Sequence, residues 1–154
     1  MESFDLVAMG GTFDVIHSGH MALLKKSFSI SSKVIIGLSS DQLAVKRGKS
    51  LDNDYSKRLS SLESAIEKNF PNSSYEISKL ENDFGPAVVE GSVKALVVSE
   101  ETSVKGLHLN ELRAERNLSP VEIVVVPMIL AEDGKAISST RIKNSEIDSS
   151  GNLN

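Results

Sequence analysis

Short apolar segments alternate with segments of helical periodicity, and this alternation restricts the possible folds more than any other feature of the sequence. Five apolar runs have the length and composition of buried strands, at residues 4–9, 34–38, 75–77, 95–98 and 121–126. Three longer segments carry apolar side chains at helical spacing, at residues 19–28, 55–69 and 107–117. Strands joined through helices by short links form a parallel sheet with helices on both faces. The sequence therefore predicts an α/β fold with one doubly wound, five-stranded parallel sheet.

The length of the chain indicates a single domain. A chain of 154 residues is large enough to bury roughly two-thirds of its unfolded surface without disulfides. We expect residues 1–144 to form this domain. Residues 145–154 are mostly polar, and we expect them to form a disordered carboxyl-terminal tail.

Composition and charge exclude several classes of protein. The chain has no cysteine and a formal net charge of -4, so thiolate chemistry is excluded and a general nucleic-acid surface, which needs excess Lys and Arg, is not expected. No apolar run approaches the ~20 residues that cross a bilayer, and the first residues lack the basic start of a signal peptide. We expect a cytoplasmic protein without a nucleic-acid or membrane partner; its oligomeric state stays open.

A glycine pair follows the first predicted strand and precedes the first predicted helix. The segment consists of Gly10, Gly11, Thr12, Phe13 and Asp14. Glycines at this place let backbone amides approach an anion closely, and the helix start adds partial positive charge. The segment matches neither the dinucleotide pattern nor the Walker loop. It predicts a phosphate site, with a plain tight turn as the alternative.

Two of the three histidines lie at the start of that helix. His17 and His20 flank Gly19, and a spacing of three places both imidazoles on one side of the first turn, where they could hold one phosphate together. Ser18 is placed to cap the helix. Two ordinary structural histidines or a zinc pair are the alternatives, although no third zinc ligand stands at a fixed offset.

Two further segments carry phosphate-binding residue types. Residues 46–49 hold three cations, Lys46, Arg47 and Lys49, after the second predicted strand. Near the carboxyl terminus, three hydroxyls precede an arginine at a predicted helix start: Ser138, Ser139, Thr140 and Arg141. Hydroxyls, amides and a forked guanidinium bind phosphate oxygens. A plain Ser/Thr helix cap is the alternative for this last segment.

These segments together resemble the nucleotidyltransferase superfamily with a His-x-Gly-His motif and a carboxyl-terminal Ile-Ser-Ser-Thr motif. Residues 10–14, 83–87 and 97–102 are similar to the archaeal and eukaryotic branch of phosphopantetheine adenylyltransferase. The resemblance spans about residues 5–143 and implies a Rossmann-like fold. It also implies AMP transfer from ATP to 4'-phosphopantetheine, giving dephospho-coenzyme A and pyrophosphate in coenzyme A biosynthesis.

The resemblance assigns roles to individual residues. It implies that Thr12 contacts the attacking phosphate and that His17 and His20 contact the nucleotide, with His20 acting on the transition state. Lys46 matches the family's mobile basic position, with Lys49 as the alternative, and Arg58 falls at a basic position that could equally be a solvated helix charge. Further residues expected to touch substrate phosphates are Gly10, Gly11, Phe13, Ser138, Ser139, Thr140 and Arg141. Mg2+ is expected to arrive with ATP, held by phosphate oxygens and water rather than by a protein cage.

Other activities share these motifs, because the motifs recognise the triphosphate and not the acceptor. A sister enzyme could use CTP with glycerol 3-phosphate, or ATP with a flavin or nicotinamide mononucleotide. A regulator from another class would bind nucleotide without chemistry. Binding of ATP without pyrophosphate release for any acceptor would identify the regulator.

Overall fold

The computed structural model describes residues 4–82, 85, 92–135, 137 and 139–153. It contains a five-stranded sheet in the order β3-β2-β1-β4-β5, and all four strand pairings are parallel. The strands are β1 (Phe4–Gly11), β2 (Ser31–Ser39), β3 (Tyr75–Leu80), β4 (Ala95–Ser99) and β5 (Glu122–Val126). The predicted α/β class and the predicted five-stranded parallel sheet are confirmed.

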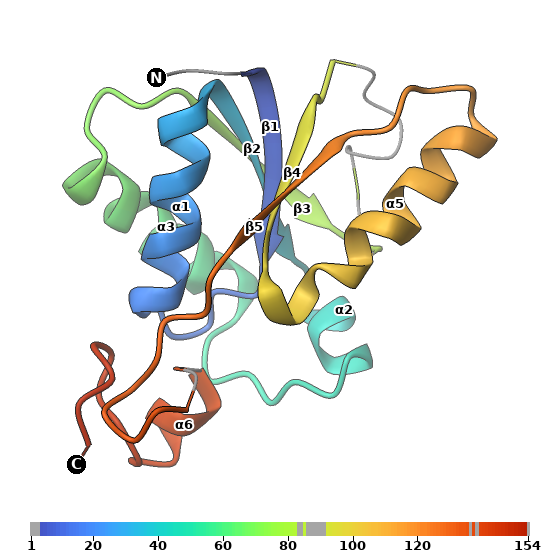
Figure 1. Ribbon diagram of the computed structural model, residues 1–154. Coiled ribbons are helices and arrows are strands. Elements are labelled where there is room, and N and C mark those ends of the chain that lie inside the picture. Colours follow the sequence, from blue (N-terminus) through green and yellow to red (C-terminus); the bar gives the residue numbers. More distant parts are fainter. Residues whose placement is uncertain (1–3, 83–84, 86–91, 136, 138, 154) are drawn as a thin grey trace.

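Helices cover both faces of this sheet (Figure 1). The longer ones are α1 (Ser18–Ile30), α3 (Tyr55–Asn69) and α5 (Val104–Glu115). Two shorter helices, α2 (Asp41–Lys46) and α6 (Ser139–Lys143), and the 3-10 turn η1 (Glu100–Thr102) complete the fold. In the described part of the chain, no helix is both long and apolar enough to span a bilayer.

Alternating apolar side chains of β1, β2 and β4 divide between two cores, as the period of two in a strand requires. Val7 and Met9 of β1 pack in the core that contains Leu24 of α1 and Leu62 of α3. Ala8, between them, packs in the core that contains Leu109 of α5. The helices α1 and α3 therefore cover one face of the sheet, and α5 covers the other.

The strand order places a crevice at β1. The chain moves outward from β1 to β2 and β3, then returns to the other side of β1 to form β4 and β5. In such sheets, ligands bind beyond the carboxyl ends of the strands where the order reverses. The segment 10–20 leaves β1 at this point, so the topology places the predicted phosphate loop and the histidine turn at the crevice.

Two local predictions differ from the structure. Residues 41–46, for which no helix was predicted, form α2; Ser40 caps this helix by accepting a hydrogen bond from the Leu43 amide, and Leu43 is buried. Six residues are too few for helical periodicity to show in a sequence. At α1 the capping residue is His17 and not Ser18.

Among the described residues 145–153, Ile147 and Ser149 make contacts with the rest of the chain. Ile147 is 1% exposed and lies in a small core with Ala131 and Ile137. The Ser149 carbonyl accepts a 3.1 Å hydrogen bond from the Ser18 amide at the start of α1. Ile147 thus contributes apolar contacts in a segment whose composition is otherwise polar.

Candidate active site

A cleft of about 880 Å3 lies at the carboxyl ends of the strands. Its walls come from the end of β1, the start of α1, the loop after α2, the end of β4 and α6. Of the residues predicted for the site, it is lined by Gly10, Gly11, Thr12, Phe13, His17, His20 and Lys49. The tertiary structure thus brings the loop, the histidine turn and part of the basic segment together.

The first loop is held in a strained conformation. Phe13 has φ 52°, in the left-handed region that few non-glycine residues adopt, and its side chain is only 1% exposed. Such strain persists only where the surroundings enforce it, commonly at functional sites. The Phe13 ring lies 4.6 Å from the His20 ring, centroid to centroid. The buried phenylalanine therefore forms a platform for the catalytic candidate His20.

Two glycines of these segments stand where a side chain would not fit. A Cβ at Gly10 would lie 2.9 Å from the Gly37 carbonyl oxygen on the neighbouring strand. A Cβ at Gly19 would lie 2.9 Å from the His17 ring. Close approach of backbone and ring thus explains two glycines of the motifs, and it allows the His17 ring to fold over the helix start.

The first turn of α1 fixes the orientation of both imidazoles. The Gly19 amide donates to His17 Nδ1 at 3.1 Å, and the His17 amide donates to His20 Nδ1 at 3.2 Å. The two rings stack, with centroids 3.9 Å apart. Because Nδ1 accepts in both residues, the neutral rings carry their proton on Nε2. The helix cap therefore leaves two Nε2–H donors for a ligand.

Both histidines are neutral at pH 7. Burial lowers the pKa of His17 to about 4. Burial first, and then the charges of His17 and Lys49, lower the pKa of His20 to about 3. A neutral imidazole can donate an N–H hydrogen bond to an anion without transferring its proton. The pair is thus suited to stabilising charge on a phosphorus centre rather than to acid–base chemistry.

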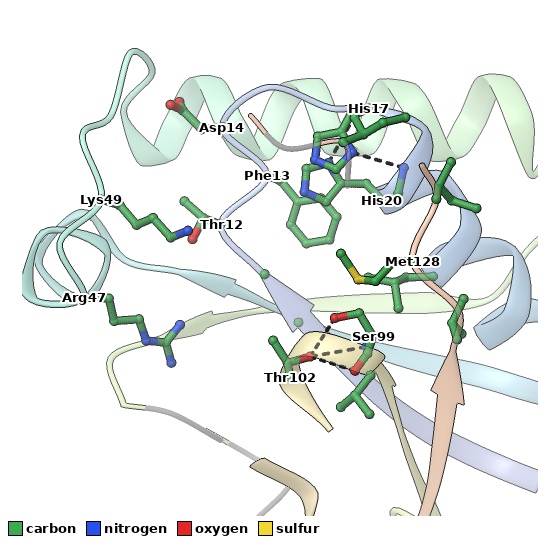
Figure 2. Close-up of a pocket in the computed structure, with 18 of the residues that line it drawn as sticks. Thr12, Phe13, Asp14, His17, His20, Arg47, Lys49, Ser99, Thr102 and Met128 are labelled. Carbon is green, nitrogen blue, oxygen red and sulfur yellow. Dashed lines mark hydrogen bonds between the residues drawn. The ribbon is translucent and has the colours of Figure 1, made fainter. Parts of the chain in front are cut away.

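The basic segment contributes Arg47 and Lys49 to the cleft, whereas Lys46 does not line it. Lys46 is the last residue of α2 and is exposed. Figure 2 shows Lys49 extending from the loop toward Thr12. Arg47 donates to Ser39 Oγ at 3.4 Å. Of the two lysines considered for the mobile basic position, the structure places Lys49 beside the predicted phosphate loop.

Arg58 is neither a solvated helix charge nor a lining residue of the cleft. Its exposed fraction is 0%, and its guanidinium donates to the carbonyls of Thr12, Ser39 and Asn53 at 2.8–3.1 Å. It also pairs with Asp41 at 2.6 Å. Arg58 ties together the backbone segments that border the cleft.

The carboxyl-terminal motif is only partly described. Ser138 lies outside the described residues, and the side chains of Ser139 and Thr140 are not described, although both begin α6. Arg141 does not line the cleft; it pairs with Asp133 and Glu146. Lys143, one helical turn after Ser139, does line it. Its spacing of four from Ser139 is the signal that could have identified it.

The sequence predicted residues 83–87 and 97–102 as family motifs but assigned no contacts to them. Of residues 83–87, only Gly85 lies within the described residues. At the end of β4, Ser99 and Thr102 line the cleft and hydrogen-bond each other, with 3.1 Å between their hydroxyl oxygens. Pro127 and Met128 add an apolar wall. Lys105 of α5 also lines the cleft.

No group of three or more His, Asp or Glu side chains that could hold a metal ion occurs among the residues described.

Comparisons with known proteins agree with this architecture. The cytidylyltransferase-like family model matches residues 8–145. The chain is 42% identical to a phosphopantetheine adenylyltransferase of Methanosarcina acetivorans, over 96% of this chain and 94% of that protein. It is 41% identical to one of Pyrococcus horikoshii, over 99% of this chain and 96% of that protein. A crystal structure of a protein of unknown function from Archaeoglobus fulgidus superimposes with a TM-score of 0.72, at 28% identity, covering 80% of this chain and 89% of that one.

The matched segment contains the loop, the histidine turn and α6, so the similarity includes the cleft and not only the sheet. The chain belongs to the cytidylyltransferase-like family and, within it, to the phosphopantetheine adenylyltransferases of the archaeal type.

Proposed function

We propose that this protein transfers the AMP group of ATP to 4'-phosphopantetheine, giving dephospho-coenzyme A and pyrophosphate. The observation that carries the proposal is the arrangement of two neutral imidazoles, both with Nδ1 bonded to backbone, beside Lys49 and the strained loop. Named relatives with this activity match nearly the whole chain. Together they support a triphosphate site at the crevice beside β1.

In the proposed reaction, an oxygen of the acceptor phosphate attacks the α-phosphorus of ATP. The bond from that phosphorus to the bridging oxygen breaks, and pyrophosphate leaves with the electron pair. No covalent bond to the protein forms. The protein has to align two polyanions and stabilise the charge that develops between them.

We assign roles from the positions of the side chains in the cleft. Thr12 holds the acceptor phosphate, and the Nε2–H groups of His17 and His20 hold the α-phosphate in the transition state. Lys49, in place of Lys46, provides the positive charge near the attacked phosphorus. Ser138, Ser139 and Thr140 hold the leaving pyrophosphate. ATP enters as its magnesium complex, whose ion is coordinated by phosphate oxygens and water.

The deciding experiment measures pyrophosphate release from ATP or CTP with each of four acceptors. These are 4'-phosphopantetheine, glycerol 3-phosphate, flavin mononucleotide and nicotinamide mononucleotide. We expect turnover with ATP and 4'-phosphopantetheine only. Turnover with another pair would replace the acceptor in the proposal. ATP binding without release for any acceptor would identify a regulator instead of an enzyme.

A further inference from the structure

One ammonium group joins three segments that border the cleft. Lys143 of α6 pairs with the carboxylate of Asp14, which follows Thr12 and Phe13. The same Nζ donates to the carbonyl of Ser50, in the loop that carries Lys49, at 2.6 Å. These segments are more than thirty residues apart in sequence, and Lys143 bonds to both of the others from the end of α6.

Asp14 also binds the loop that carries Lys49 directly. Its carboxylate accepts hydrogen bonds from the amides of Asp52 and Asn53 at 3.0 and 2.9 Å. Its side chain is only 4% exposed. Burial would raise the pKa of Asp14, but the hydrogen bond from Lys143 and those from the two amides outweigh burial and lower it. Asp14 is therefore an ionised anchor for the loop that bears Lys49.

We propose that Lys143 is a positioning residue, which aligns the Lys49 loop and α6 with the Thr12 loop by binding Asp14 and Ser50 at once. This inference rests on the proposed triphosphate site. The consequence is that groups from three distant segments meet ATP in one fixed arrangement. A displacement on the order of 1 Å in such an arrangement can lower turnover by roughly 100-fold.

Direct binding of phosphate by Lys143 is the competing role, and the contacts disfavour it. The Lys143 side chain is 17% exposed, and its ammonium has two partners in place. To reach a phosphate it would leave the buried Asp14 carboxylate without its positively charged partner, which is strongly unfavourable. The freed carboxylate would also repel the incoming triphosphate.

The test compares Lys143→Met, Asp14→Asn and the double variant, with Lys143→Arg as the conservative change. Lys68→Met, at an exposed lysine near the end of α3, is the control. Two quantities are measured for each protein: the ATP dissociation constant by calorimetry without acceptor, and pyrophosphate release with 4'-phosphopantetheine. Circular dichroism confirms the fold. If Lys143→Met does not fold, Lys143→Gln replaces it, because glutamine retains a donor for Ser50 without the charge.

If Lys143 acts through Asp14, each single variant weakens ATP binding by ~10-fold, and the double variant is no weaker than the worse single one. Lys143→Arg retains most of the affinity, and Lys68→Met retains all of it. Unchanged or tighter ATP binding in Asp14→Asn, with weak binding in Lys143→Met, would show a direct phosphate ligand and overturn the proposal. Lower thermal stability with wild-type affinity and turnover would overturn it as well.

The two measurements separate this inference from the proposed function. If the wild-type protein binds ATP but releases no pyrophosphate, the proposed reaction fails while the affinities still test the role of Lys143. If the wild-type protein turns over and every variant keeps both the wild-type ATP affinity and the wild-type turnover, the positioning role fails alone.

Discussion

At the scale of single residues, His20 combines a donor aimed at the cleft with a structural contact behind it. Its Nδ1 accepts from the His17 amide, and its ring lies against Phe13. Only Nε2 is left to meet a ligand. The motif therefore uses the backbone of α1 to set the tautomer, which a pair of freely rotating histidines would not achieve.

We predict that His20→Ala lowers turnover ~100-fold or more, the effect of losing one transition-state donor. The fold should persist, because α1 loses one cap contact and keeps its buried face. Pyrophosphate release at saturating substrates is the measurement. His108→Ala, at an exposed position of α5 outside the cleft lining, is the control and should be unaffected. Turnover near the wild-type level in His20→Ala would remove this residue from the mechanism.

The two lysines of the basic segment should differ in their effect on turnover. Lys49 lines the cleft and lowers the pKa of His20 by its charge, whereas Lys46, at the end of α2, does not line the cleft. We expect Lys49→Ala to reduce kcat/KM by ~100-fold, as for loss of a charged contact to the transition state. Lys46→Ala should change it less than about threefold. Equal defects in the two variants would contradict the placement of the loop.

At the scale of elements, short segments with few local signals complete the cleft. The helix α2 ends where the basic loop begins, and α6 brings Lys143 to Asp14. The carboxyl-terminal segment supports the helix start next to the histidines, because the Ser149 carbonyl accepts from the amide of Ser18. These contacts are the reason that segments without strong periodicity take defined positions.

A pair of variants tests whether the carboxyl-terminal segment belongs to the domain. Ile147→Ala should lower the free energy of unfolding by about 2 kcal/mol, the low end for a buried isoleucine, because its core is small. Leu153 is 50% exposed, and Leu153→Ala should change the free energy by about 0.5 kcal/mol or less. Urea denaturation measures both. Equal effects would mean that residues 145–153 do not pack as described.

At the scale of the whole molecule, burying two neutral histidines makes stability depend on pH. Their folded pKa values are about 4 and about 3, below the ordinary value of 6.5. Between pH 6.5 and these lower folded values, the unfolded chain therefore binds more protons than the folded one. Stability is fully present above pH 6.5 and is lost as the pH falls toward 4.

We expect the free energy of unfolding to fall by on the order of 1 kcal/mol per pH unit for each histidine in this window. Urea denaturation at pH 7, 6, 5 and 4.5 measures the slope. A double variant, His17→Gln with His20→Gln, should have a shallower slope, because glutamine does not titrate. The same slope in both proteins would show that other groups cause the acid sensitivity.

The sequence by itself determined the class of fold and the chemical character of the site. Apolar runs and helical spacing are local patterns, so the strands and the helices α1, α3 and α5 follow from them to within a few residues. The glycine loop and the histidine turn are local as well. Their residue types and their place after β1 indicated phosphate binding before any contact between distant segments was known.

Only the tertiary structure decided which charges face the cleft. Lys46 and Lys49 are equivalent in the sequence, and the path of the loop after α2 selects Lys49. Arg58 has the spacing of a helix charge, yet it is buried among carbonyls of distant segments. The pair of Asp14 and Lys143 joins residues that no local pattern relates. Side-chain direction in loops and the partners of a buried charge depend on packing between distant segments, and therefore emerge only in the folded chain.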